Sequence, residues 1–149
     1  STVDIETTLE KDLNFNIGEA DPFSVNESFI ISATDNHEFA RYRENIREIQ
    51  INRVYYQVIQ YSGTENVLLT GTLEIGPLDV QVEDLDLNAM YNTGQENELD
   101  LFESELRQLA DELDAEDEVE GSLTGNVSDK PLDFTVRLIM DVEFRAAVL

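Results

Sequence analysis

The chain has 149 residues, of which 41% are hydrophobic, and its 33 Asp and Glu against nine Lys and Arg give a formal net charge of -24. A field of that sign repels nucleic acid and anionic membrane surfaces, which excludes both as direct partners. The absence of cysteine excludes disulfides, thiolate chemistry and cysteine-based zinc sites.

The basic residues are also unusual, because Lys11 and Lys130 are the only lysines. An acidic chain poor in lysine suits a salt-rich medium, where screening relieves self-repulsion. Two explanations follow from this composition. The source is marine or halophilic, or the protein is an acidic secreted one.

The length predicts a single domain over residues 1–149. No apolar run approaches the roughly 20 residues needed to span a bilayer. The chain starts at Ser1 without a Met or a signal segment. We expect a mature or trimmed fragment of an exported protein, whose signal or anchor is not present in this chain.

The first third of the chain predicts two strands and a helix. Apolar residues fall at nearly every second position from Val3 to Ile17, and a second strand follows the turn at 21–22, with Phe23 to Ile31. A helix near residues 36–48 is then expected, with Asp35 as its cap and Glu38 completing a capping box.

The middle of the chain predicts three more strands and a second helix. A strand over about 49–61 changes parity near Asn52-Arg53, which predicts a β-bulge. A strand over 67–75 ends at Gly76-Pro77, and another runs from Val80 through Leu87. Leucines at helical spacing predict a helix near 98–114.

The C-terminal part predicts two strands, over 119–127 and over 132–148, and in the last one every even position is apolar. About seven strands, short turns and two inserted amphipathic helices predict a mainly β protein, an antiparallel β-sandwich. We expect both helices to pack on a sheet edge or on an open end.

Two short segments resemble each other, Leu69-Thr-Gly-Thr-Leu73 and Leu123-Thr-Gly-Asn-Val127. Either they record an internal duplication, or five residues coincide by chance.

The segment from Asp84 to Gln95 has the spacing of a calcium loop, with acidic or amide side chains at positions 1, 3, 5 and 9. Position 6 is Ala89, where the sharp turn requires glycine, and position 12 is Gln95 in place of a bidentate Glu. We interpret Asp84 and Asp86 as the solvent face of a strand, which predicts adventitious cations at most and no dedicated metal site.

The sequence contains no recognisable catalytic motif, and therefore no candidate catalytic residue. His37 is the only histidine and is expected to be exposed at a helix start. No serine lies in a nucleophile elbow, and no glycine-rich loop could hold a phosphate. With 33 acids, a pair of carboxylates at a catalytic distance arises by chance. The prediction is therefore no catalytic, cofactor-binding or metal-ligating residue.

Three further groups of residues allow a functional and a structural interpretation. Arginines at 41, 43, 47 and 53 either receive an anionic partner or pair with neighbouring Glu38, Glu44 and Glu48. Tyr55 and Tyr61 form a small sugar-stacking face or a second hydrophobic layer beneath a helix. Asn26-Glu-Ser28 and Asn126-Val-Ser128 match a glycosylation sequon, which matters only in a glycosylating pathway.

Three segments together resemble a group of uncharacterised bacterial cell-envelope lipoproteins with a β-sandwich body. They are residues 42–51 leading into a Tyr/Val strand, residues 69–73, and residues 125–134 before the long last strand. The order of elements is also similar, at the level of fold, to late-embryogenesis-abundant type 2 domains. The resemblance implies a cell-envelope location and a sandwich fold, and carries no functional residue over to this chain.

These observations favour a non-enzymatic exported domain with a binding or assembly role at a cell envelope, whose partner is an unknown envelope protein or glycan. The alternative is an accessory module that binds carbohydrate or calcium. A hydrolase that uses two carboxylates ranks last.

Overall fold

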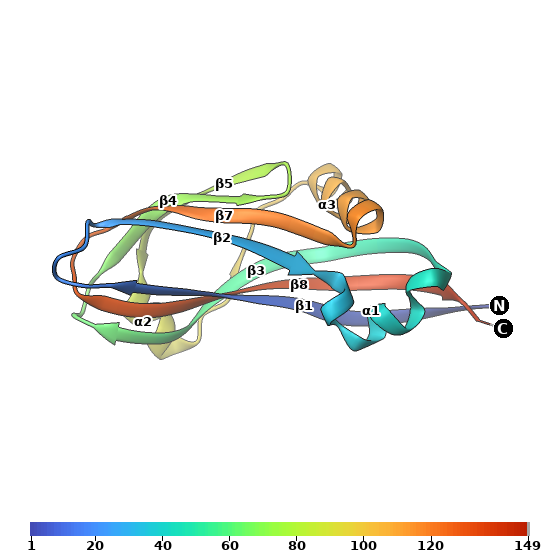
Figure 1. Ribbon diagram of the computed structural model, residues 1–149, viewed down its shortest axis with the longest axis horizontal. Coiled ribbons are helices and arrows are strands. Elements are labelled where there is room, and N and C mark those ends of the chain that lie inside the picture. The colour runs from blue at the N-terminus through green and yellow to red at the C-terminus, as the bar shows by residue number, and fades with distance from the viewer. Residues whose placement is uncertain (149) are drawn as a thin grey trace.

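The computed structural model describes residues 1–148 and shows two four-stranded antiparallel sheets packed face to face (Figure 1). Sheet I has the order β1-β8-β3-β6, formed by Thr2–Ile17, Leu132–Ala147, Ile46–Gly63 and Asn97–Glu98. Sheet II has the order β2-β7-β4-β5, formed by Ser24–Ser32, Glu118–Val127, Leu68–Ile75 and Leu78–Asp86. The predicted antiparallel β-sandwich is confirmed.

The two long terminal strands form the spine of the molecule. β1 and β8 pair without interruption from Thr2 opposite Ala147 to Ile17 opposite Leu132. The predicted even-numbered row of β8 faces the other sheet, and from Leu132 to Ala146 every member of it is buried. Because the chain reverses direction between these strands, both termini lie side by side at one end of the sandwich (Figure 1).

β3 supplies the third long strand and contains irregularities that the sequence only partly revealed. The predicted bulge is present, as a register shift between Ile51 and Arg53 relative to β8. Two further shifts lie at 46–48 and 58–60. Each inserted residue restores the apolar side chains to the inner face, so that Val54, Tyr56 and Val58 all point into the core.

The first predicted helix is much shorter than expected. α1 spans only His37–Tyr42, followed by a 3₁₀ turn η2 at Arg43–Asn45, and β3 begins at Ile46. Pairing of Ile46 with Ala146 of β8 adds this segment to sheet I, so tertiary pairing prevails over the helical pattern. The cap is not Asp35, which lies in the preceding 3₁₀ turn η1 (Ala33–Asp35), but Asn36, whose side chain accepts from the Phe39 N–H at 3.0 Å.

The predicted second helix begins later and ends later than expected. α3 spans Glu103–Glu116, whereas residues 97–98 form β6 and pair with Tyr55 and Tyr56 of β3. The Phe102 N–H donates to the Glu105 side chain at 2.9 Å, which satisfies one free N–H at the helix start. α3 packs on β3 and β7 and lies beyond the ends of β4 and β5, where it covers the core in place of sheet II (Figure 1).

A third helix was not predicted. α2 spans Leu87–Thr93 and packs against β3 with Leu87 and Met90 buried. Asp86 caps it by accepting from the Ala89 N–H at 3.0 Å, and Gly94 ends it in the left-handed conformation. The expectation that Leu87 and Asn88 continue a strand is therefore wrong, because a cap and a terminal glycine surround a seven-residue helix.

The two similar segments pair with each other in the centre of sheet II. Leu69 to Leu73 of β4 lies antiparallel to Leu123 to Val127 of β7, with Gly71 directly opposite Gly125. A Cβ atom added at Gly71 would lie 2.1 Å from the Thr124 carbonyl oxygen. The shared Thr-Gly pattern thus marks a close approach of two strand backbones.

One hydrophobic cluster joins both sheets and all three α-helices. Phe39 of α1 contributes an edge-on contact to Phe144 at 5.9 Å, and Phe15 stacks on Phe134 at 4.6 Å. Within residues 1–148, no helix is both long enough and apolar enough to cross a membrane.

Candidate functional site

The segment with calcium-loop spacing has a structural role at each acidic position. Asp84 adopts a positive φ of 46°. Its backbone N–H donates to the Thr70 hydroxyl of the neighbouring strand at 3.0 Å, and that hydroxyl donates to the Asp84 carboxylate at 3.1 Å. Asp86 caps α2, and Asn88 lies within that helix. Among residues 1–148, no three or more His, Asp or Glu side chains are grouped as metal ligands.

His37 lies in the first turn of α1 and is exposed, as predicted from its position. Beside it, Asn36 ties α1 to sheet I, because its amide donates to the Thr7 hydroxyl at 2.9 Å and to the Thr8 carbonyl at 3.0 Å.

Two of the four clustered arginines, Arg43 and Arg53, pair with acids, but not with the neighbours that the sequence suggested. Arg43 contacts Asp117 and donates to the Asp114 carbonyl at 3.0 Å, which joins η2 to the end of α3. Glu48 lies 3.9 Å from Arg145. The partners come from distant segments because β3, β8 and α3 pack together, so the prediction of local pairs with Glu38, Glu44 and Glu48 is wrong.

Arg53 is half-exposed and contacts two acids and an aromatic ring. Its guanidinium lies 2.6 Å from Asp141 and 3.5 Å from Glu96, and stacks 4.0 Å above the Tyr55 ring. The hydrogen bond to Asp141 raises the pKa of Arg53. This arrangement covers Tyr55, which is only 9% exposed and pairs with the buried Ile139 of β8.

Tyr55 therefore belongs to a second hydrophobic layer and not to a sugar-stacking face, although β6 and Arg53 flank it in place of the expected helix. Tyr61 is half-buried against the main core and its hydroxyl donates to the Thr64 carbonyl.

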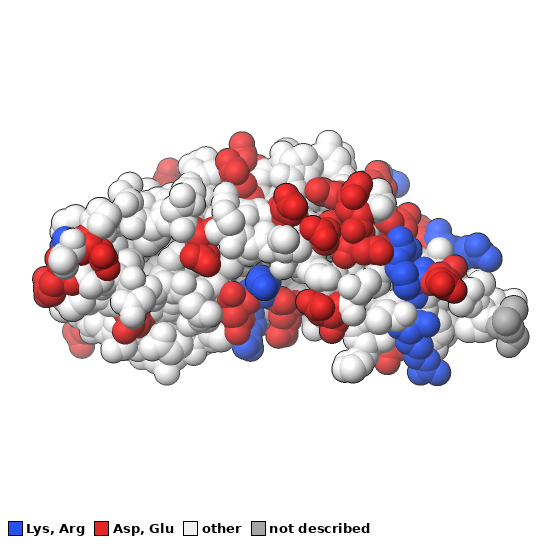
Figure 2. Space-filling model, in the orientation of Figure 1, with Lys and Arg blue, Asp and Glu red and all other residues white. Residues whose placement is uncertain are grey.

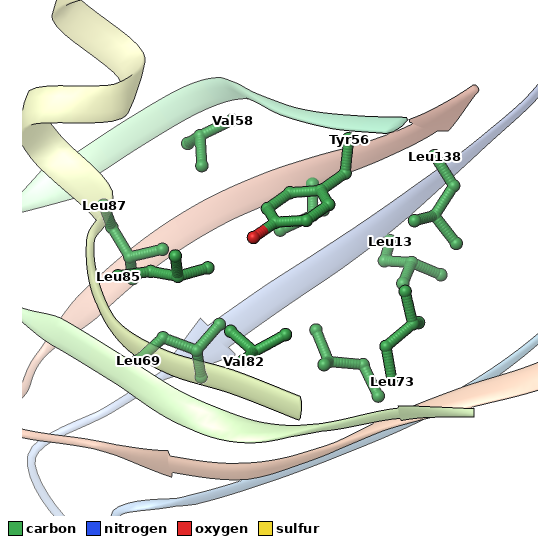
Figure 3. A pocket seen from close by; sticks show the side chains of 11 residues that line it. Leu13, Tyr56, Val58, Leu69, Leu73, Val82, Leu85, Leu87 and Leu138 are labelled. Atoms are coloured by element: carbon green, nitrogen blue, oxygen red, sulfur yellow. The ribbon is translucent and has the colours of Figure 1, made fainter. Parts of the chain in front are cut away.

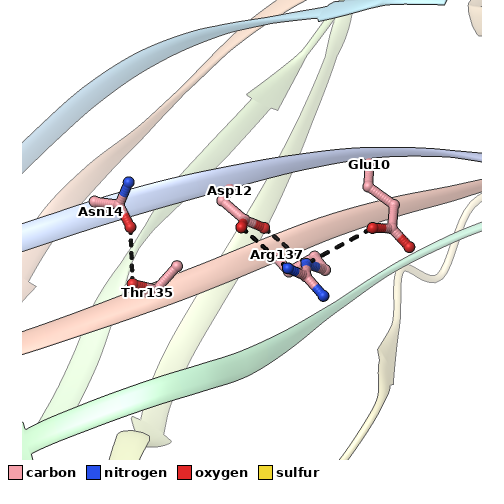
Figure 4. A network of polar contacts seen from close by, with 5 residues as sticks. All are labelled: Glu10, Asp12, Asn14, Thr135 and Arg137. Carbon is pink, nitrogen blue, oxygen red and sulfur yellow. Dashed lines mark hydrogen bonds and ion pairs between the residues drawn. The ribbon is translucent and has the colours of Figure 1, made fainter. Parts of the chain in front are cut away.

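The outer face of sheet I carries ion pairs between neighbouring strands (Figure 4). Arg137 of β8 donates to both oxygens of Asp12, at 2.7 and 3.1 Å, and lies 3.8 Å from Glu10. The hydrogen bond to Asp12 raises the pKa of Arg137. At the neighbouring pair of positions the Thr135 hydroxyl donates to the side-chain oxygen of Asn14 at 2.8 Å. These groups are exposed, so each pair contributes at most about 1 kcal/mol.

A small cavity lies between the two sheets and is lined by apolar side chains and Tyr56 (Figure 3). Its volume is about 20 Å³, the size of one water molecule, which is too small for an organic ligand. The Tyr56 hydroxyl points into this space from β3, and burial raises the pKa of Tyr56. The cavity is a packing defect of the core and offers no binding site.

An open groove separates the edge strands β1 and β2, and each strand places a charge there at an inward-facing position. Lys11 interrupts the apolar row of β1 between Leu9 and Leu13, and Glu27 interrupts that of β2 between Val25 and Phe29. Inward-facing charges on edge strands prevent a further strand from pairing there. This groove is therefore protected against strand addition.

The outer face of sheet II has a polar, uncharged patch over β2, β7 and the adjoining positions of β4 and β5. We call this surface the neutral face. Its members alternate with buried apolar residues along the four strands, and all are exposed or half-exposed: Ser24, Asn26, Ser28, Thr70, Thr72, Gln81, Ser122, Thr124 and Asn126.

The strand register places these side chains in rows across the sheet. One row runs Asn26, Thr124, Thr72 and Gln81 through all four strands. Carboxylates surround this patch on the same sheet, with Glu74, Asp79, Glu83, Asp84 and Glu120 exposed on β4, β5 and β7. Further carboxylates crowd around α3 (Figure 2).

Most side chains in the β2–β7 half of the neutral face make no internal hydrogen bond. The exception is Ser122, whose hydroxyl donates to the Glu74 carboxylate at 3.3 Å. Thr72 and Gln81 are 3.2 Å apart and bond to each other. By contrast, Asn26, Thr124 and Asn126 make no side-chain hydrogen bond to any other residue between 1 and 148. Their donors and acceptors are available to a partner. Both sequon asparagines, Asn26 and Asn126, lie on this face.

The amino-acid sequence contains a partial signal for this surface. The strands of sheet II contain neither Lys nor Arg, and their exposed positions are rich in Ser, Thr and Asn. What the sequence did not reveal is which strands are neighbours.

Comparison with protein-family models finds no match, and comparison with curated proteins finds none either.

Proposed function

We propose that this chain is a non-enzymatic, exported β-sandwich module with a binding or assembly role at a cell envelope, akin to the envelope lipoproteins that its sequence resembles. The observation that carries the proposal is the chemical difference between its two broad faces. Sheet I presents paired charges, whereas sheet II presents the neutral face, whose β2–β7 half has free hydrogen-bonding groups.

The shape of the molecule supports this role. The two strands of the spine, β1 and β8, are each 16 residues long, and β3 beside them has 18 residues, so three long antiparallel strands stiffen one another. Both termini lie at one end, beside α1 (Figure 1). A membrane anchor or a neighbouring domain joined at either terminus would leave the neutral face accessible.

A carbohydrate-binding accessory module is the second candidate, and the neutral face favours it, since hydroxyl and amide groups are the usual hydrogen-bonding partners of sugars. Calcium binding has less support, because Asp84 and Asp86 are engaged in the structure of β5 and α2.

The test uses the chain immobilised through its C-terminus, at the end away from the neutral face, and an envelope extract of the organism that encodes it. Retained proteins and glycans are identified and cross-linked residues are mapped. We expect a reproducible partner that contacts the sandwich. Recovery of no protein and no glycan, from detergent-solubilised and detergent-free extracts alike, would overturn the proposal.

A further inference from the structure

The neutral face presents a regular array of hydrogen-bonding groups. Asn26, Thr124, Thr72 and Gln81 follow one another across the sheet, and Ser24 and Asn126 start the next row. Neighbouring side chains are about 4.8 Å apart across the strands and about 7 Å apart along them. Each amide and each hydroxyl both donates and accepts, so the array can match a partner with repeated hydroxyl groups.

Charge restricts the partner further. No strand of sheet II contains Lys or Arg, and the whole chain carries -24, so an anionic polymer is repelled. A cationic partner would be attracted to the carboxylates of sheet I and α3 and to Glu74, Asp79 and Glu83, which lie beside the neutral face, rather than to its uncharged centre. An apolar partner finds only Ile30, which is 46% exposed, on these four strands.

We propose that the neutral face binds a neutral polysaccharide, which lies across the row from Asn26 to Gln81. This inference rests on the proposed binding function and names the class of partner. No aromatic ring lies on the face to stack on a sugar. Because each hydrogen bond replaces one to water, its net contribution is small. Binding therefore needs many contacts, and affinity rises with the length of the sugar chain.

The experiment measures binding of the full chain by native gels that contain hydroxyethyl cellulose, laminarin, galactomannan or dextran, with alginate as the anionic control. ¹⁵N-labelled protein is then titrated with an oligosaccharide series of the retarding polymer. We expect retardation by at least one neutral polymer and none by alginate. The amide shifts should centre on Asn26, Thr72 and Thr124, and should grow from disaccharide to hexasaccharide.

Two variants with the same change of charge localise the binding. Thr124→Glu places a carboxylate in the centre of the neutral face, whereas Thr2→Glu places one on β1 of sheet I, opposite Ala147. A carboxylate held against a neutral polymer loses hydration without gaining a partner. We expect Thr124→Glu to weaken binding about tenfold or more, and Thr2→Glu to bind as the parent does.

The outcomes separate this inference from the function on which it rests. Retardation that Thr124→Glu abolishes, in a variant whose amide spectrum remains folded, supports the inference. Retardation unaffected by Thr124→Glu, or amide shifts on another face, overturns the inference and leaves the binding function standing. Absence of retardation by every neutral polymer also overturns the inference, while the envelope extract tests the binding function by itself.

Discussion

The close approach of β4 and β7 at Gly71 and Gly125 gives the sharpest test of the fold. A Cβ at Gly71 would lie 2.1 Å from the Thr124 carbonyl oxygen, and a Cβ at Gly125 would lie 2.2 Å from that of Thr70. Ordinary contact begins at 3.4 Å, so the backbones would have to separate by about 1.3 Å in the first case. Because the obstructing atoms belong to the backbone, no side chain can move aside to relieve the contact.

The cost follows from two effects. Overpacking of a tight site costs typically about 1–3 kcal/mol, and weakening a strand hydrogen bond adds about 1 kcal/mol. We therefore expect Gly71→Ala and Gly125→Ala each to lower the free energy of unfolding by about 2–4 kcal/mol, a large part of the stability of a small domain. For a chain of this size the melting temperature should fall by roughly 5–12 °C.

Urea unfolding followed by circular dichroism measures the change, with Gly18→Ala as the matched control. A Cβ at Gly18 meets only the end of the Asp21 side chain, at 3.3 Å, and its backbone is compatible with alanine. We expect the control to stay within about 0.5 kcal/mol of the parent. Equal midpoints for Gly71→Ala, Gly125→Ala and the control would refute the pairing of the two similar segments at their glycines.

Three other predictions follow from the structure. Replacing Lys11 and Glu27 together with Val removes the inward-facing charges of both edge strands, so the double variant should self-associate in sedimentation velocity while the parent stays at its original sedimentation coefficient. Asp86→Ala removes the cap of α2 and should lower the free energy of unfolding by about 1 kcal/mol; an unchanged urea midpoint contradicts this. Burial, together with Glu120 and Glu116, raises the pKa of Glu112 above its value of 4.5 in the unfolded chain. The ionised carboxylate is therefore less favourable in the folded state, and stability falls as the pH rises through the folded pKa. Glu112→Gln should raise the melting temperature at pH 7, and the gain should vanish below about pH 4.5; a gain that persists in acid contradicts this origin.

The alternation of apolar and polar side chains predicted most of the fold. The rows in β1 and β8 are long enough to define both strands and their buried faces, and the parity change at Asn52-Arg53 located a real bulge. Period-two patterns are robust because a slip by one residue would expose the whole apolar row. The register itself and the strand order had no such signal.

The helices were harder to predict. Phe39, Tyr42 and Ile46 are apolar at helical spacing, yet Ile46 already pairs with Ala146 of β8. α2 has only seven residues and two buried apolar side chains, too few to establish a period. Asp86 and Gly94 are its only signals, and Asp86 also fits the alternation of the preceding strand.

Sequence by itself determined the class of this protein. Its alternating strands and its charge predict a β-sandwich with an acidic exterior, because local periodicity and composition do not depend on which strands meet. Tertiary structure alone decided the surfaces. Asn26, Thr124, Thr72 and Gln81 are separated by up to 98 positions along the chain, and only the pairing of β2, β7, β4 and β5 brings them into one uncharged row.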